Sequence, residues 1–107
     1  MTISADLLRG YTDTIIMRQL ASGDGYGYGI SREVAEKSDG TVVLKEATLY
    51  TAFRRMEQNG YIRSYWGDET TGARRRYYSL TELGMEKLTE EKNAWEKTRE
   101  VMDTLLD

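Results

Sequence analysis

The sequence predicts a mainly helical α+β fold, in which three helices and a two-stranded hairpin precede one long C-terminal helix. Three observations predict it. Apolar residues recur at helical spacing before residue 60, two β-prone runs flank a polar stretch between residues 62 and 80, and no helix breaker follows Gly84. A chain of 107 residues can enclose one compact core. We therefore expect residues 1–80 to form one domain and residues 81–107 to form a helix that projects from it.

The first helix is predicted from Ser4 to Ala21, where four apolar residues share one helical stripe. The glycine-rich run 23–29 must end it, because glycine lowers helix propensity and permits positive φ. Alternating glycines also suggest a phosphate-binding loop, but no buried strand precedes this run and no Gly-Lys-Ser/Thr ends it, so we interpret it as a connector. A short second helix is expected from about Ile30 to Lys37, and a brief β-segment over residues 41–44. The four stripe residues are Leu8, Ile15, Ile16 and Leu20.

The third helix is expected to begin within a few residues of Glu46 and to end at Gly60, where a left-handed C-terminal cap needs glycine. Its apolar residues fall on one arc at helical spacing, which predicts the face buried in the core. They are Leu49, Ala52, Phe53 and Met56. The residues on the opposite side are small, hydroxylated, polar or cationic, namely Ala47, Thr51, Arg54, Arg55 and Gln58.

Two β-prone runs, Ile62–Trp66 and Arg75–Leu80, flank the polar stretch 67–73 and predict a β-hairpin with an arginine cluster on its return strand. Thr81 then opens a long helix to Leu106. At about 1.5 Å per residue this helix spans about 38 Å, which is longer than a core of this size can cover.

Leu88, Trp95 and Met102 recur every seven residues along the long helix and form an apolar seam. Either this helix packs on its own domain, or its seam meets a second copy of the chain. We favour dimerisation, because the N-terminal helices already supply a core and the seam strengthens toward the free end.

Composition excludes several classes of function. The chain has no Cys and no His, which excludes disulfides, thiolate or imidazole metal sites, and any nucleophile or base that uses these side chains. No bound cofactor or metal is expected. The N-terminus lacks a signal-like pattern and no apolar run approaches the roughly 18 residues of a membrane span, so a cytoplasmic protein is expected. An enzyme is the weakest alternative, because the acidic pairs are explained as solvated helix surface and no constellation of reactive side chains can be inferred.

The charge is unevenly distributed along the chain, whose net charge is −3. Residues 41–80 carry seven basic and four acidic side chains, whereas residues 81–107 carry four and eight. Six of the seven basic residues in the middle are arginines, which suit planar contacts to phosphates and base edges. An acidic protein can bind an anion through such a local patch.

Three helices followed by a two-stranded hairpin, or wing, make a winged helix-turn-helix, which places the third helix in the major groove of double-stranded DNA. The residues expected to face DNA are Thr48, Tyr50, Thr51, Arg54 and Arg55 on that helix, and Arg74 and Arg75 near the tip of the wing. Two local alternatives stay open: Tyr50 is partly buried beside Phe53, or the wing arginines pair with Asp68 and Glu69. The alternative function is a winged-helix protein-interaction module without DNA binding, which the acidic pI of about 5.1 favours.

Several spaced motifs in this sequence resemble those of PadR-type transcriptional regulators. They are Tyr26-Gly27-Tyr28, Glu46-Ala47-Thr48-Leu49-Tyr50, Arg55-Met56-Glu57, Gly60-Tyr61-Ile62 and the run from Arg75 to Gly84. The single C-terminal helix is similar to the short subfamily, and residues 64–69 with Trp95 resemble its multidrug-binding members. The resemblance implies a homodimeric repressor that binds a pseudo-palindromic operator. It also implies that the C-terminal helix packs against the partner's first helix and that a small molecule lowers DNA affinity.

The same resemblance implies a slot between the Trp95 indoles of two chains, where small planar aromatic compounds stack. Residues expected near this slot are Leu7, Gly10, Thr14, Thr98, Arg99 and Met102. Arg99 stands one turn beyond Trp95, so no preference for cations is expected, and neutral or anionic planar compounds should be tolerated. The alternative is that Trp95 is a packing residue with a large apolar area.

Overall fold

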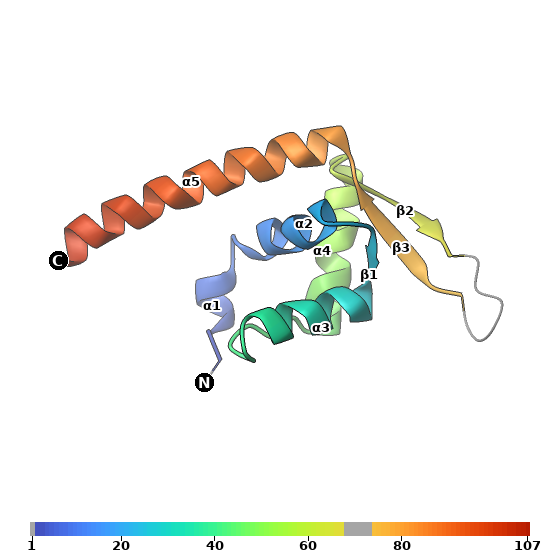
Figure 1. Cartoon of the computed structure of the whole chain (residues 1–107), viewed down its shortest axis with the longest axis horizontal. Coiled ribbons are helices and arrows are strands. Elements are labelled where there is room, and N and C mark those ends of the chain that lie inside the picture. The colour runs from blue at the N-terminus through green and yellow to red at the C-terminus, as the bar shows by residue number, and fades with distance from the viewer. Residues whose placement is uncertain (1, 68–73) are drawn as a thin grey trace.

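The computed structural model describes residues 2–67 and 74–107, and its helices and strands follow one another as Figure 1 shows. The helices are α1 (Ala5–Leu8), α2 (Thr12–Ala21), α3 (Gly27–Lys37), α4 (Glu46–Gln58) and α5 (Glu82–Leu106). The strands are β1 (Gly25–Tyr26), β2 (Ile62–Trp66) and β3 (Arg76–Leu80), in one antiparallel sheet of order β1-β3-β2. The mainly helical winged architecture and the long C-terminal helix are therefore as predicted.

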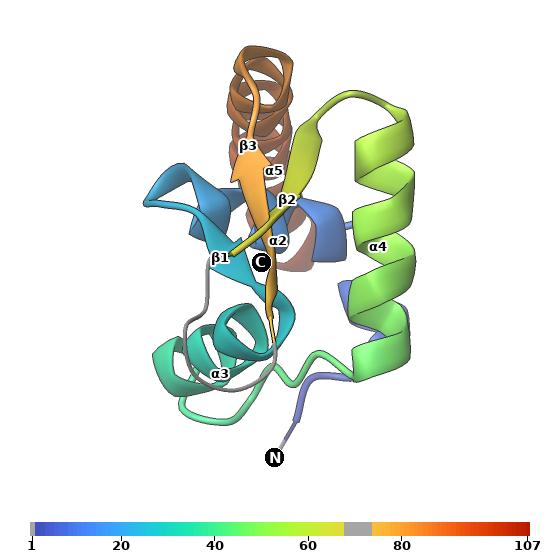
Figure 2. The ribbon, with the colours of Figure 1, turned by 90° about the vertical axis from the view of Figure 1, so that its right-hand side faces the viewer.

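The core lies where α2, α3 and α4 meet the inner face of the sheet (Figures 1 and 2). The four residues predicted for the inner face of α4 are all buried, at 2% exposure or less. Phe53 stacks on Tyr78 of β3 with ring centroids 3.9 Å apart, so α4 is tied directly to the wing. Gly60 follows α4 with a φ of +79°, a left-handed conformation that glycine adopts more readily than other residues.

The first predicted helix is wrong in one respect, because the chain breaks it into α1 and α2 between Arg9 and Tyr11. Gly10 has a φ of +97°, a left-handed conformation that stops α1 and redirects the chain. The predicted start is confirmed, since the Ser4 side chain accepts a hydrogen bond from the Leu7 amide at 3.3 Å.

The glycine-rich connector also differs from the prediction, because Gly25 and Tyr26 pair with Tyr78 and Tyr77 as a third strand. α3 starts directly afterwards at Gly27, three residues before the expected start near Ile30.

The β-segment expected at residues 41–44 is absent from the described chain, where these residues form an irregular extended connection. Side-chain hydroxyls take over part of the backbone hydrogen bonding: the Ser38 hydroxyl accepts from the Val42 amide at 3.0 Å, and Ser31 donates to the Leu44 carbonyl at 3.2 Å.

Helix α5 is as long as predicted, and its buried residues lie near its start. The Thr81 hydroxyl caps it by accepting from the Gly84 amide at 3.0 Å. Gly84 packs directly on the turn between α4 and β2, since a Cβ at residue 84 would clash with the Tyr61 carbonyl oxygen. Leu88 is buried against the core, whereas residues 92–107 are all exposed. We call residues 92–107 the arm; Figure 1 shows it extending past α2.

Among the described residues, no helix combines the length and the apolar character that a membrane span requires.

Candidate nucleic-acid interface

The outer face of α4 carries the side chains predicted to face DNA. All five of these residues, Thr48, Tyr50, Thr51, Arg54 and Arg55, are exposed. Because successive residues of a helix are about 100° apart, Thr51 and Arg54 lie opposite the buried arc, whereas Thr48 and Arg55 lie on the flank toward α2. Arg54 forms no hydrogen bond or ion pair with any other residue in ranges 2–67 and 74–107, so its guanidinium faces solvent at the centre of this surface.

Arg55 has a partner within the chain. Its Nε and Nη2 atoms donate to the two carboxylate oxygens of Asp13 on α2, at 3.0 and 2.5 Å. These hydrogen bonds are the main reason that the pKa of Arg55 lies above its ordinary value. The pair joins the flank of α4 to the first turn of α2. Two hydrogen-bond donors of Arg55, a residue predicted to face DNA, are therefore already bound to Asp13.

Tyr50 lies at the opposite edge of the α4 surface, beside α3. Its ring meets Phe53 edge to face at a centroid distance of 5.6 Å, yet 42% of the residue remains exposed. Tyr50 is therefore partly buried beside Phe53 and also accessible to solvent. Its contact with DNA stays a prediction.

The wing holds its arginines against aromatic rings. The Arg75 guanidinium lies 4.7 Å from the ring centroid of Tyr26, and that of Arg74 lies 5.5 Å from the Trp66 indole. Arg76 also lies over the Trp66 ring, 5.9 Å from its centroid, and in addition donates to the Ser64 hydroxyl at 2.7 Å and lies 3.6 Å from the Glu57 carboxylate on α4. The proposed partners Asp68 and Glu69 lie outside the described residues.

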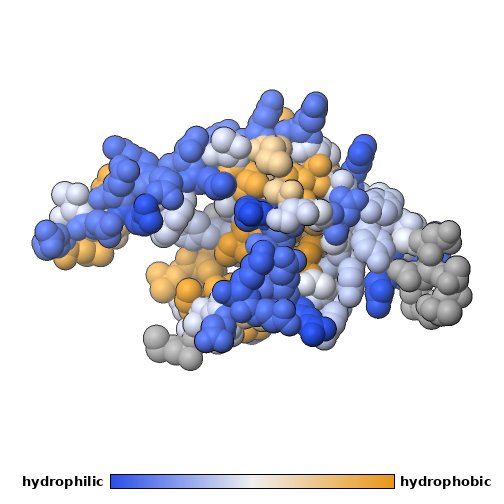
Figure 3. All heavy atoms as spheres, viewed as in Figure 1, coloured by the Kyte–Doolittle hydropathy of each residue, from blue (hydrophilic) through white to orange (hydrophobic). Residues whose placement is uncertain are grey.

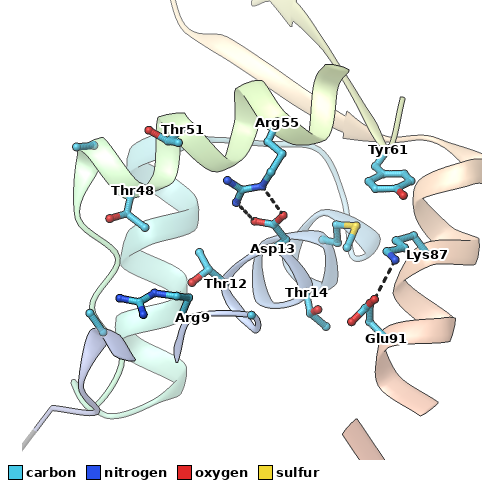
Figure 4. A pocket seen from close by; sticks show the side chains of 14 residues that line it. Arg9, Thr12, Asp13, Thr14, Thr48, Thr51, Arg55, Tyr61, Lys87 and Glu91 are labelled. Atoms are coloured by element: carbon cyan, nitrogen blue, oxygen red, sulfur yellow. Dashed lines mark hydrogen bonds and ion pairs between the residues drawn. The ribbon is translucent and has the colours of Figure 1, made fainter. Parts of the chain in front are cut away.

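A groove of about 680 Å³ lies between α2, α4 and the first turns of α5 (Figure 4). The Arg55–Asp13 pair stands in one wall, and an ion pair between Lys87 and Glu91, 3.0 Å apart, stands in the wall formed by α5. Two residues predicted for the ligand slot line this groove, Gly10 and Thr14, together with Thr48 and Thr51 from the DNA-facing set.

The other residues predicted for the ligand slot lie elsewhere. Trp95 contacts Tyr11 of its own chain edge to face, with ring centroids 5.4 Å apart, and is 44% exposed. Arg99 is paired with Glu96 at 2.6 Å. Leu7 is exposed on α1, and Thr98 and Met102 are exposed on the arm. Tyr11 is not among the residues predicted for the slot, although it follows Leu8 by three residues and so lies beside the apolar stripe of the predicted first helix.

Exposed apolar surface lies on α1 and on the arm, as well as on the wing and at the start of α5. Figure 3 shows it near the free end of the arm and around α1, on either side of the space between them. The exposed apolar residues of α1 and the arm are Leu7, Trp95, Val101, Met102, Leu105 and Leu106, each at least 41% exposed. No group of three or more acidic side chains in the described residues is arranged to hold a metal ion.

Comparison with known proteins gives consistent matches. The Transcriptional regulator PadR-like family is matched by residues 16–90. A solved structure of a transcriptional regulator from Clostridium thermocellum is 46% identical and has a TM-score of 0.91, with 99% of this chain and 100% of that chain covered. A PadR family transcription regulator from Clostridium difficile is 40% identical with a TM-score of 0.81, covering 91% of this chain and 99% of that one. A protein of Lysinibacillus sphaericus, described as uncharacterized protein X, is 37% identical over 105 residues, which are 98% of this chain and 96% of that protein.

Proposed function

The chain belongs to the PadR-like family of transcriptional regulators, and from this premise we propose that it is a dimeric repressor whose operator affinity falls when a small planar aromatic compound binds. As a member of this family it is a DNA-binding transcriptional regulator and not an enzyme. The proposal adds the dimer, the operator contacts and the ligand.

One observation carries the proposal for DNA binding: Arg54 projects from the centre of the outer face of α4 with no partner in the described chain. An arginine left open on an otherwise acidic protein fits a base edge or a phosphate of the major groove. Thr48 and Thr51 flank it with hydroxyls that can donate to phosphate. Tyr50 adds a contact beside α3, and Arg74 and Arg75 of the wing would meet the neighbouring backbone or the minor groove.

The test is Arg54→Ala, measured on a duplex selected by footprinting the DNA beside the protein's own gene. We expect operator affinity to fall about tenfold or more, because one good arginine contact contributes about 1–3 kcal/mol. The thermal midpoint should stay nearly unchanged, since an exposed surface substitution changes stability by only about 0.5 kcal/mol. Arg18→Ala is the matched control, because Arg18 is exposed on α2 and hydrogen-bonded to Ser22. Equal operator binding by Arg54→Ala and the parent would remove α4 from the proposed interface.

The proposed ligand site begins at Trp95, whose exposed indole is steadied on one side by Tyr11. In a dimer in which each arm packs against α1 and α2 of the partner, two such indoles would flank the symmetry axis and leave a flat slot for a planar aromatic compound. Arg99 is already paired with Glu96, so the slot should accept neutral compounds, with anionic ones tolerated.

Fluorescence titration with a panel of planar aromatic compounds checks this site. We expect quenching in the parent and in Trp66→Phe, and its loss in Trp95→Phe, because the indole that stacks on the compound is then absent. Quenching that survives in Trp95→Phe but vanishes in Trp66→Phe would place the binding site on the wing instead. Absence of binding throughout would leave Trp95 as a packing residue.

A further inference from the structure

Gly27, the first residue of α3, lies directly against the ring of Tyr50 on α4. A Cβ at residue 27 would lie 2.6 Å from the Tyr50 hydroxyl oxygen and 3.0 Å from the ring carbon that bears it. Both separations are shorter than van der Waals contact allows. Gly27 is buried and its φ is not in the left-handed region, so the site needs glycine for space rather than for backbone conformation. Helix propensity alone would favour alanine, which points to packing as the reason for glycine here.

The missing side chain determines where Tyr50 points. One end of the ring rests on the start of α3, and its edge-to-face contact with Phe53 fixes the other side. Phe53 in turn is held by its stack on Tyr78. The Tyr50 hydroxyl, at the junction of the two helices, makes no hydrogen bond with any residue in the described ranges.

We infer that Gly27 is a positioning residue for operator binding, because it lets the Tyr50 ring lie across the α3–α4 junction with its hydroxyl directed at the DNA backbone. A tyrosine hydroxyl donates well to a phosphate oxygen, and such contacts set the register of a protein on the duplex. The inference rests on the proposed function, which places α4 on DNA.

The geometry also predicts what Gly27→Ala would change in the structure. The atom that would clash is the far end of a side chain that is 42% exposed, so Tyr50 can swing outward without disturbing the core. The fold should therefore survive while the hydroxyl leaves its place. Arg18→Ala again serves as the control, because Arg18 is exposed on α2 and hydrogen-bonded to Ser22.

The experiment is a double-mutant cycle of Gly27→Ala and Tyr50→Phe, with operator and random-duplex affinities and thermal midpoints measured for each protein. In the parent background, Gly27→Ala should weaken operator binding about tenfold, the equivalent of one hydrogen bond to a charged group. In the Tyr50→Phe background it should change affinity by less than about twofold, because the hydroxyl is already gone. Arg18→Ala should bind as the parent does.

Tyr50→Phe alone also tests the inference and does not depend on how well any Gly27 variant folds. It should lose about tenfold in operator affinity at an unchanged thermal midpoint. Parent-like binding by Tyr50→Phe, or an equal loss from Gly27→Ala in both backgrounds, would overturn the inference and leave the proposed function standing. A parent protein that binds no duplex would instead overturn the proposed function, and the inference with it.

Discussion

Two neighbouring arginines on α4 have different environments in the folded protein. Arg54 and Arg55 are adjacent in sequence and both exposed, yet Arg54 faces solvent while Arg55 is held by Asp13, 42 residues away. The helical pattern predicts that both leave the core, because that depends on spacing alone. It does not predict the partner of Arg55, because that depends on how α2 packs across α4.

Tyr78 gives a prediction at the scale of one residue. Burial raises its pKa above the ordinary value of 10.0, because the buried phenolate would lose its hydration. A tyrosine whose pKa is raised in the folded state stabilises the protein fully below about pH 10, and that contribution is lost as the pH rises through the folded pKa. Tyr78→Phe keeps the stack on Phe53 and removes the ionisable group. We therefore expect its free energy of unfolding to fall less than the parent's between pH 8 and pH 11.

Urea unfolding at both pH values measures this difference, and Tyr28→Phe is the control because Tyr28 is 69% exposed. If the free energy of unfolding of Tyr78→Phe falls between pH 8 and pH 11 as much as that of the parent, ionisation of Tyr78 is not the cause of the loss.

Helices and strands could be predicted from the sequence where a pattern of several residues, rather than one residue, determines them. The bounds of α4 and α5 follow from long periodic runs with a clear stop or cap, and those of β2 and β3 from β-prone runs on either side of a polar stretch. The break at Gly10 was missed because one glycine inside a helical pattern costs only about 1 kcal/mol, and packing decides whether the helix continues. Strand β1 has two residues, too few for a period, and it exists because β3 lies beside it. A strand at residues 41–44 was predicted from residue type alone and finds no partner in the described sheet.

The arm yields the prediction at this scale. Deleting the residues after Lys92 removes only exposed positions, so the winged core should keep its fold. It also removes Trp95, Val101, Met102 and Leu105, which supply the apolar face proposed to meet the partner's α1 and α2. We expect a monomer by light scattering that binds operator at least tenfold more weakly, because two half-sites can no longer be held together.

A full-length variant, Leu105→Glu, provides a second check of the arm, because it keeps the helix and places a charge on its apolar face. A truncated protein that is still dimeric would show that the interface lies outside the arm.

Across the whole molecule, the distribution of charge matters more than its total. The chain is acidic overall, while its arginines gather on α4 and the wing. Such an arrangement should allow binding where both meet the duplex and oppose it elsewhere. Arg74 and Arg75, held over Trp66 and Tyr26, are suited to contact phosphates without reading sequence.

Replacing Arg74 and Arg75 together by alanine tests this role of the wing. We expect similar losses of affinity for operator and random DNA, and a slope of log affinity against log salt concentration that is smaller by about two. Arg18→Ala should leave the slope unchanged. A loss confined to operator would mean that the wing reads bases, and absence of any salt dependence in the parent would favour a protein-interaction module.

The exposed arm has a consequence for the dynamics of the chain. Residues 92–107 form fewer than five turns of exposed helix, with Trp95 in contact with Tyr11 near the start of the arm, and an isolated helix of this length is marginal in water. Its amide hydrogens should therefore exchange with solvent within a short labelling time in dilute protein, whereas those of the buried face of α4 should resist. If the arm is ordered by a second chain, its protection will rise with protein concentration. Hydrogen exchange at two concentrations would then report assembly residue by residue, and the amount of protein in the cell would itself set how much of the arm is folded.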